Sequence, residues 1–514
     1  MTHRTLRSLT TGALMLVAQL AHAQDEDMAG SPAADKPVTA TTDAAGSTSG
    51  KGAGASADAS TAHADEAKAE PANAKPAPAT TAAPTEGLTV KINDWSLGVY
   101  GYAALNVMHD STQSFGPAAG NTILQRVGTF KGNNNQLQFT ARDSRFGLRI
   151  AAPATSWLKA SAVMETDFSG TQPTESSEQT TYITNPLRMR HYYLKAETPV
   201  VDVLAGQYHD LFGWGGKGFY PSTLAFLGVT GQVYHRQPQF RLSKTIATSA
   251  VDFEIAAAAA RPVQRASGLP DGEAGLRLAI NQWTGIGQQG YGQPTLGPLE
   301  LGVSGIGRRF EVAQFVEFPG GSNTINGWGV AVNAFIPVVP AKSVSDRANA
   351  LSITGEFSKG SGIGDMYNSD LTGGALFPTL PNPQSRGIDP ANPPPIYPAN
   401  IDSGIVTYDG NGKVKAIDWQ AFIVGLQYYL PVAQGKVWIS GNFAQLKSPN
   451  IVKLTPIAGR PAVYKDAQYI DGNLFVALSP ALQIGYSFQM VQQTFGDNVK
   501  AKNYRNEGGL HFFF

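Results

Sequence analysis

The sequence predicts an all-β protein: a 16-stranded antiparallel transmembrane β-barrel that follows a disordered N-terminal extension. Segments of about ten residues alternate apolar and polar side chains from Leu88 onward, which is typical of barrel strands in a membrane. Short and long connections alternate between these segments, as in an up-and-down barrel with tight turns at one rim and long loops at the other. The closing stretch "NEGGLHFFF" places Gly508, Leu510, Phe512 and Phe514 on one strand face. Together these three observations predict the barrel.

Residues 1–23 have the pattern of a secretory signal peptide. Arg4 and Arg7 precede a short apolar stretch at 14–20, and "AHA" ends at Ala23, where we expect cleavage. A membrane anchor is the alternative, but this apolar stretch is too short to span a bilayer. The pattern therefore predicts export from the cytoplasm.

Residues 24–86 consist almost entirely of Ala, Thr, Ser, Gly, Pro, Asp and Lys. Such a segment cannot bury enough apolar surface to offset the entropy lost on ordering. We interpret it as a disordered, Ala/Thr/Pro-rich periplasmic extension. The barrel then occupies residues 87–514.

The composition excludes several other classes of protein. Charged residues make up 15% of the chain, and no apolar run reaches the roughly 20 residues of a transmembrane helix. The absence of cysteine removes thiol nucleophiles and cysteine metal sites. Beyond residue 86 the chain is only mildly positive, which is too little for binding nucleic acid. The histidines show no metal-ligand spacing.

We therefore expect no enzyme activity, no cofactor and no metal. His209 and Asp210 with Ser222 are the residue types of a hydrolase triad, but a triad is defined by geometry rather than by residue types. No Gly-x-Ser-x-Gly motif accompanies them.

The alternating segments give a count of strands. Eight run in one direction, beginning near residues 97, 157, 200, 250, 298, 348, 436 and 481. Eight run in the other, beginning near residues 135, 187, 238, 273, 325, 417, 469 and 503. The stretch 284–297 is interpreted as a connection, although it is long for a turn at the tight rim.

The stretch "LQFTARDSRFGLRI", residues 137–150, changes step in its middle. Its apolar residues are odd-numbered before Asp143 and even-numbered after Ser144. A one-residue β-bulge at these two positions would keep both apolar sets toward lipid. The arginines Arg142, Arg145 and Arg149 would then face the lumen, avoiding the roughly 2–4 kcal/mol cost of a lipid-facing arginine at the bilayer midplane. The alternative is a bend at a rim of the barrel.

Further arginines share the inward faces of later strands: Arg188, Arg190 and Arg241. With the three above they could form a basic ladder along the pore, because guanidinium groups bind carboxylates through two hydrogen bonds. The alternative is that these arginines pair with Asp143, Glu165 and Asp167 and fill the wall. The sequence leaves both open.

Segment 209–237, "HDLFGWGGKGFYPSTLAFLGVTGQVYHRQ", is too apolar for a loop in water. Folding into the lumen as a constriction loop would bury that surface. Its polar candidates for the pore lining are Asp210, Lys217, His235 and Arg236. Packing on a neighbouring subunit is the alternative.

Two hairpin segments resemble a known family. "DSRFGLRIAAPATSWLKASAVMETDF" and "LRMRHYYLKAETPVVDVLAGQYHDLFG" are similar to consecutive hairpins of Gram-negative trimeric porins, most of all the DcaP-like outer-membrane porins, and "RQPQFRLS" resembles their strand after the constriction loop. The resemblance covers residues 135–245. It implies a homotrimer in outer-membrane lipid through which small anionic solutes such as dicarboxylates diffuse. It also implies insertion by the outer-membrane assembly machinery, for which the C-terminal Phe514 is the signal.

Two other functions fit the same sequence. Aromatic residues on the loop and walls could instead form a path for sugars. Alternatively, the barrel could be structural or adhesive, with residues 24–86 tethering it to the cell wall.

Overall fold

A computed structural model describes the chain in these ranges: 88–114, 116, 122–170, 186–215, 223–224, 228–263, 267–288, 294–314, 321–341, 343–368, 404–409, 412–455 and 457–514. The expected signal peptide, residues 1–23, and the expected extension, residues 24–86, lie outside these ranges. Within them, no helix combines the length and the apolar character needed to cross a membrane.

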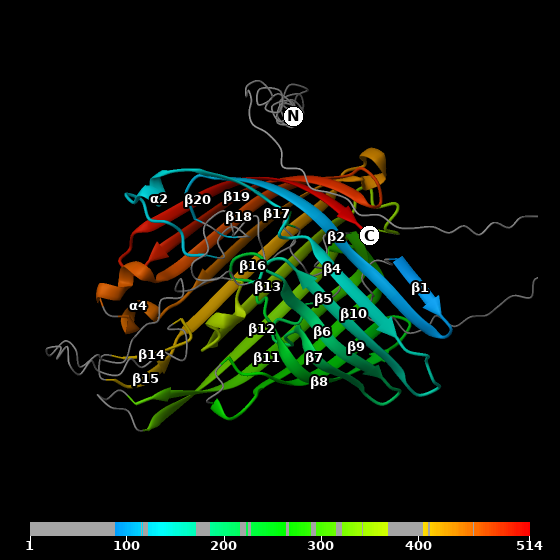
Figure 1. Ribbon diagram of the computed structural model, residues 1–514, viewed down its shortest axis with the longest axis horizontal. Helices are drawn as coiled ribbons and strands as arrows, with labels where there is room; N and C mark the ends of the chain where they lie inside the picture. Colours follow the sequence, from blue (N-terminus) through cyan, green and yellow to red (C-terminus); the bar gives the residue numbers. More distant parts are fainter. Residues whose placement is uncertain are drawn as a thin grey trace, which may run out of the picture. The chain divides into compact units, whose positions relative to one another are not determined.

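The described strands form a closed antiparallel barrel with 16 positions around its wall (Figure 1). β2 pairs with β20, which closes the barrel, and β3 and β4 together occupy the second position, because both pair with β2. In order the wall consists of β2 (Trp95–Asp110), β3 (Gln136–Thr140) with β4 (Arg145–Ala151), β5 (Lys159–Asp167), β6 (Arg188–Glu197), β7 (Asp202–His209), β8 (Arg236–Ala247), β9 (Val251–Ala260), β10 (Asp271–Gln288), β11 (Pro294–Ala313), β12 (Ser322–Val339), β13 (Leu351–Ser361), β16 (Asp418–Tyr429), β17 (Val437–Lys447), β18 (Tyr464–Ala477), β19 (Leu482–Phe495) and β20 (Lys500–Phe513).

The predicted number and direction of the strands are confirmed, but the connection expected at 284–297 is wrong. β10 continues to Gln288 and β11 already begins at Pro294. The β10–β11 ladder is irregular between Ile280 and Thr284 and then resumes with Thr284 opposite Pro298. Residues 284–288 and 294–297 thus lie in a ladder that extends beyond an irregularity, and residues 289–293 lie outside the described ranges.

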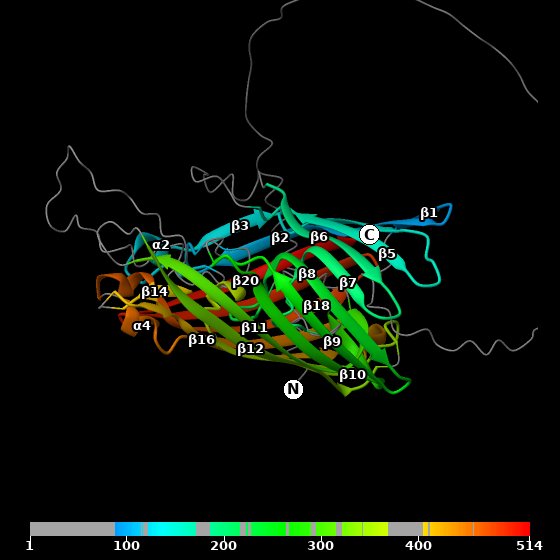
Figure 2. The ribbon, with the colours of Figure 1, turned by 90° about the horizontal axis from the view of Figure 1, so that it is seen from below.

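Short elements lie outside the wall. β1 (Leu88–Ile92) forms a hairpin with the start of β2, and β14 (Val406–Tyr408) pairs with β15 (Val414–Ala416). The helical turns are α2 (Phe130–Asn133), η2 (Gly364–Met366), η4 (Val432–Gly435), α4 (Ile451–Leu454) and η5 (Ile457–Ala462). Seen from below, the wall strands curve around one interior (Figure 2).

Alternation along each strand separates an apolar exterior from a mixed interior. On β12, Trp328, Val330 and Val332 are exposed, whereas Ala331 between them and Asn333 and Phe335 beyond them are buried. Exposed apolar side chains of this kind recur on most wall strands and form a surface suited to lipid.

The change of step in residues 137–150 is a β-bulge. Thr140 pairs with Asn106 and Arg145 with Tyr102, so the four residues 141–144 lie opposite the three residues 103–105. The Ser144 amide donates to the Ala141 carbonyl oxygen over 3.0 Å. One extra residue therefore restores the inward and outward faces, which confirms the predicted bulge.

Candidate functional site: the constriction inside the barrel

The described parts of segment 209–237 are packed against the inner wall. Leu211, Phe212, Leu224, Val229 and Val233 are all buried. Phe212, Val229 and Val233 belong to one apolar cluster with residues of β16–β20 such as those at 419, 446, 464 and 491. We call this segment the constriction loop. Its apolar side chains explain why it enters the barrel, since entry removes them from water.

Glycines on the inner wall mark where the constriction loop lies. A Cβ at Gly485 would come 2.4 Å from Cδ1 of Leu224, and a Cβ at Gly329 would come 2.9 Å from Cζ of Phe212. Separations this short do not occur between real atoms, so any larger residue at these two positions would require the facing loop side chain to move.

Two wall carboxylates hold the backbone of the constriction loop. Glu273 Oε2 on β10 accepts hydrogen bonds from the Leu211 amide over 2.6 Å and the Phe212 amide over 3.1 Å. Glu356 Oε1 on β13 accepts from the Val233 amide over 2.7 Å. Each carboxylate thus satisfies loop donors that would otherwise be buried without partners.

The base of the loop is closed by its own residues. His235 Nδ1 lies 2.5 Å from Asp210 Oδ2, and the Asp210 amide donates to the His235 carbonyl oxygen over 3.2 Å. Burial alone would lower the pKa of His235, but the Asp210 carboxylate outweighs this and raises it above 6.5. The pair therefore favours the charged imidazolium.

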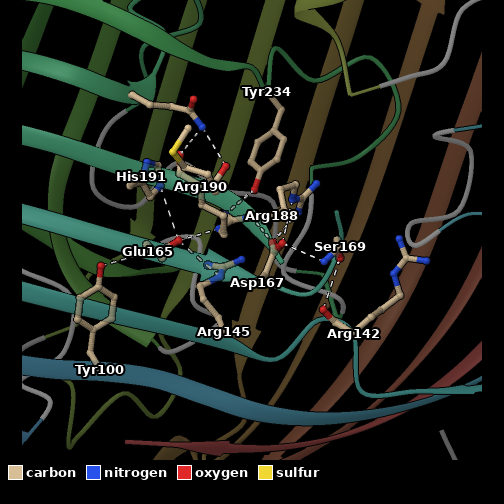
Figure 3. Close-up of polar contacts among 12 residues, drawn as sticks. Tyr100, Arg142, Arg145, Glu165, Asp167, Ser169, Arg188, Arg190, His191 and Tyr234 are labelled. Carbon is tan, nitrogen blue, oxygen red and sulfur yellow. Dashed lines mark hydrogen bonds and ion pairs between the residues drawn. The ribbon is translucent and has the colours of Figure 1, made fainter. Parts of the chain in front are cut away.

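An ion-pair network on the adjoining wall has arginines at its centre (Figure 3). Arg190 Nε lies 2.7 Å from Glu165 Oε1, and its Nη1 lies 2.9 Å from Asp167 Oδ2. Arg188 binds Asp167 through two hydrogen bonds, of 2.9 Å and 2.6 Å. Arg145 Nε lies 3.6 Å from Glu165 Oε1.

Arg236 at the start of β8 adds a fourth guanidinium near this network. Its guanidinium carbon lies 5.1 Å from the centre of the Tyr234 ring, and Arg190 Nη2 donates to the Tyr234 hydroxyl over 3.3 Å. We call Arg145, Arg188, Arg190, Arg236, Glu165 and Asp167 the arginine cluster. Its four cations and two anions leave an excess of two positive charges.

Comparison with solved structures identifies the fold. No protein-family model matches the chain, and no curated protein matches it. The outer membrane channel DcaP of Acinetobacter baumannii is 16% identical, with 83% of this chain and 99% of that chain covered and a TM-score of 0.56. The chain has the fold of the outer-membrane porins.

Two further porin structures align over similar lengths. OmpF of Salmonella typhi is 9% identical over 83% of this chain and 100% of that chain, with a TM-score of 0.47. The anion-selective porin from Comamonas acidovorans is 8% identical over 82% of this chain and 100% of that chain, with a TM-score of 0.45.

Within this porin fold, the six arginines of the expected ladder have different surroundings. Arg145, Arg188 and Arg190 make the ion pairs above. Arg142 extends away from Asp167 (Figure 3), and Arg149 lies over the Tyr100 ring at 5.9 Å. Arg241 donates to Gln239 Oε1 over 2.9 Å and to the His209 carbonyl oxygen over 2.6 Å.

The four polar residues expected to line the pore from the loop also have different surroundings. Asp210 is buried in its pair with His235, and the His235 side chain is 30% exposed. Arg236 is half-buried beside Tyr234. Lys217 lies outside the described residues.

A second bulge, in β6, was not foreseen. Glu165 pairs with His191 and Thr166 with Met189, which leaves Arg190 as the extra residue and turns both Arg190 and His191 inward. On the neighbouring strand β7, Gln207 Nε2 donates to the carbonyl oxygens of Met189 over 2.9 Å and Arg190 over 3.2 Å. The pattern of apolar residues gave no signal for this bulge, because Arg190 already had inward parity.

Another ion-pair network fixes the segment after β13. Arg308 Nε lies 3.0 Å from Asp271 Oδ2, and Arg308 Nη1 lies 2.5 Å from Asp365 Oδ1. Burial alone would raise the pKa of Asp365, but Arg308 outweighs it and lowers that pKa. The adjacent Met366 carbonyl oxygen accepts a hydrogen bond from the Tyr234 amide over 2.9 Å.

Sequence reasoning missed Tyr234, Glu273, Glu356 and Arg308. Glu273, Glu356 and Arg308 have inward parity on their strands, which is the signal that could have drawn attention to them. No group of three or more His, Cys, Asp or Glu residues in the described ranges has the geometry of a metal site.

Proposed function

We propose that the chain is an outer-membrane porin for passive diffusion of small, preferably anionic solutes of the dicarboxylate type. The observation that carries the proposal is the arginine cluster beside the constriction loop, inside a barrel with the porin fold. Its excess of positive charge on one side of the lumen attracts anions.

The geometry of the cluster supports weak rather than tight binding. The Arg190 side chain is 1% exposed, and its nitrogens are already bonded to Glu165 and Asp167. The Arg188 side chain is 33% exposed, so part of its guanidinium remains open to a passing carboxylate. A solute would meet a positive potential and only a few available donors, which suits passage without capture.

Export by the signal peptide at residues 1–23, assembly through Phe514, and a homotrimer in outer-membrane lipid belong to the same proposal. They rest on the sequence pattern and on the resemblance to the DcaP-like porins.

The experiment is the reversal potential of the purified channel in a planar lipid bilayer under a salt gradient. We expect anion selectivity that decreases in Arg188→Gln and in Arg236→Gln, because each variant removes one of the two excess charges. Lys359→Gln is the matched control, since it removes an exposed cation that shares a strand face with the outward Phe357.

A wild-type channel without ion selectivity would contradict the proposal. Block of its current by oligosaccharides would then indicate the sugar channel. Equal shifts of the reversal potential in Lys359→Gln and Arg188→Gln would exclude the arginine cluster as the source of selectivity.

A further inference from the structure

Tyr234 places its phenol against the arginine cluster, and three contacts fix its position. Its amide donates to the Met366 carbonyl oxygen over 2.9 Å, and its ring lies 5.3 Å from the ring of His209. Its hydroxyl oxygen accepts the 3.3 Å hydrogen bond from Arg190 Nη2 and points into the cluster (Figure 3). The ring is therefore held by packing that does not depend on the charge of the oxygen.

The surroundings of this oxygen favour negative charge. Arg236 lies over the ring, and Arg145 and Arg190 approach from β4 and β6. Glu165 and Asp167 compensate only two of the four guanidiniums in the cluster. A third anion at the Tyr234 oxygen would leave one excess positive charge instead of two.

We infer that Tyr234 is a titratable selectivity residue: by releasing its proton to water in the lumen, it becomes the third anion of the arginine cluster and weakens the preference of the channel for anions. This inference rests on the proposed function. It makes Tyr234 a determinant of how strongly the constriction discriminates by charge, because phenol and phenolate differ by half of the excess charge of the cluster.

The direction of the titration agrees with the geometry. Burial alone would raise the pKa of Tyr234, but Arg190, Arg236 and Arg145 outweigh it and lower the pKa from 10.0 to about 7. The phenol is thus uncharged in mildly acidic solution and loses its proton in mildly alkaline solution, well before an ordinary tyrosine.

Other titratable groups lie around Tyr234, and their titration has to be distinguished from that of Tyr234. From the wall strands, the constriction loop and the segment after β13 these are Arg145, Glu165, Asp167, Arg188, Arg190, His191, His209, His235, Arg236 and Asp365. The carboxylates are ion-paired, and arginine does not titrate in this range. The histidines are therefore the groups that a control must address.

The first measurement is the near-ultraviolet absorbance of tyrosinate in the full-length channel between about pH 6 and about pH 9. We expect the wild type to ionise one tyrosine in this range and Tyr234→Phe to ionise one fewer. Of the 18 tyrosines in the chain, Tyr193 serves as a matched control, since its ring faces Tyr208 in the same wall at 4.9 Å. Tyr193→Phe should retain the early ionisation.

The second measurement is the reversal potential over the same pH range. The anion-to-cation permeability ratio of the wild type should decrease by roughly twofold with rising pH, because half of the excess charge is lost. Tyr234→Phe should remove most of the decrease and leave only the part due to His235, whereas His235→Gln and Tyr193→Phe should keep most of it.

An anion-selective wild type with a flat profile, or a channel in which no tyrosine ionises early, would overturn the inference and leave the proposed function intact. A channel without anion preference even in mildly acidic solution would overturn the proposed function, and the inference with it.

Discussion

Two parts of the inner wall meet the constriction loop in different ways. The wall of β4–β8 carries the arginine cluster, where buried cations and anions compensate one another. The wall of β16–β20 contacts the loop mainly through apolar side chains and glycine, as at Leu224 beside Gly485. One wall therefore carries ion pairs beside the loop, and the other packs against the loop through apolar side chains.

Buried carboxylates differ between the walls as well. Glu165 and Asp167 are matched by guanidiniums, whereas Asp471 on β18 is held by Asn442 Nδ2 over 2.9 Å and by the Tyr469 hydroxyl over 2.7 Å. A carboxamide or hydroxyl stabilises a carboxyl group through hydrogen bonds without adding a charge. Loss of one partner should therefore cost far more in the arginine cluster than on the opposite wall.

The largest effect is expected from Arg190→Gln. It removes the cation shared by Glu165 and Asp167 and should lower the free energy of unfolding by about 3–5 kcal/mol, because buried negative charge is left uncompensated. Tyr469→Phe is the matched change on the opposite wall, because it removes one partner of Asp471, and it should cost about 1 kcal/mol. Denaturant unfolding in detergent, followed by tryptophan fluorescence, measures both. Equal losses would contradict the distinction between the walls.

A smaller effect is expected where the loop contacts the apolar wall. Gly485→Ala would place a Cβ 2.4 Å from Cδ1 of Leu224, so the Leu224 side chain must move and can displace the loop with it, at a cost of up to about 3 kcal/mol. Single-channel recordings should show additional current noise from the displaced loop. Gly472→Ala is the control, since no atom lies within 4 Å of its added Cβ. If both variants behave alike, Leu224 does not set the position of the loop.

The carboxylates that hold the loop backbone should give a local effect. Glu356→Gln leaves one acceptor oxygen where the carboxyl group accepts hydrogen bonds from both the Val233 amide and Asn333 Nδ2. We expect amide hydrogen exchange at Val233 to accelerate by about fivefold, corresponding to roughly 1 kcal/mol. In Glu273→Gln the acceleration should move to Leu211 and Phe212. Uniform acceleration across the loop in either variant would mean that the two carboxylates do not act locally.

The smallest effect concerns pH at the base of the loop. The pKa of His235 is raised in the folded protein, so its pair with Asp210 stabilises the fold below the unfolded value of about 6.5 and loses this contribution as pH rises through the folded pKa. With 30% of the side chain exposed, we expect less than about 1 kcal/mol.

The measurement for this pair is the difference in unfolding free energy between wild type and His235→Gln, which should shrink from about pH 5 to about pH 9. A difference that grows with pH would have the wrong sign and would exclude the ion pair as its source.

Much of the barrel could be predicted because its signals are local. Alternation with a period of two residues located the strands, and the change of parity at Asp143–Ser144 located the bulge. The apolar residues of segment 209–237 indicated that this segment folds inward, and its described parts are buried against the wall. These signals depend only on neighbours in sequence.

The candidate site was harder to predict from the sequence than the barrel. Inward parity identified Arg145, Arg188 and Arg190, but it left open whether they form a ladder or pair with carboxylates. Tyr234 gave no signal, because its role comes from contacts with Arg190 and Arg236 across different elements.

By itself, the sequence determined which side chains face lipid and which face the lumen on most strands, because a membrane strand admits only one register for its apolar face; β6 beyond its bulge is the exception. Only the tertiary structure decided how the inward charges combine. Glu165, Arg190 and Tyr234 meet from β5, β6 and the constriction loop, and the net charge of such a cluster depends on distances that no single strand contains.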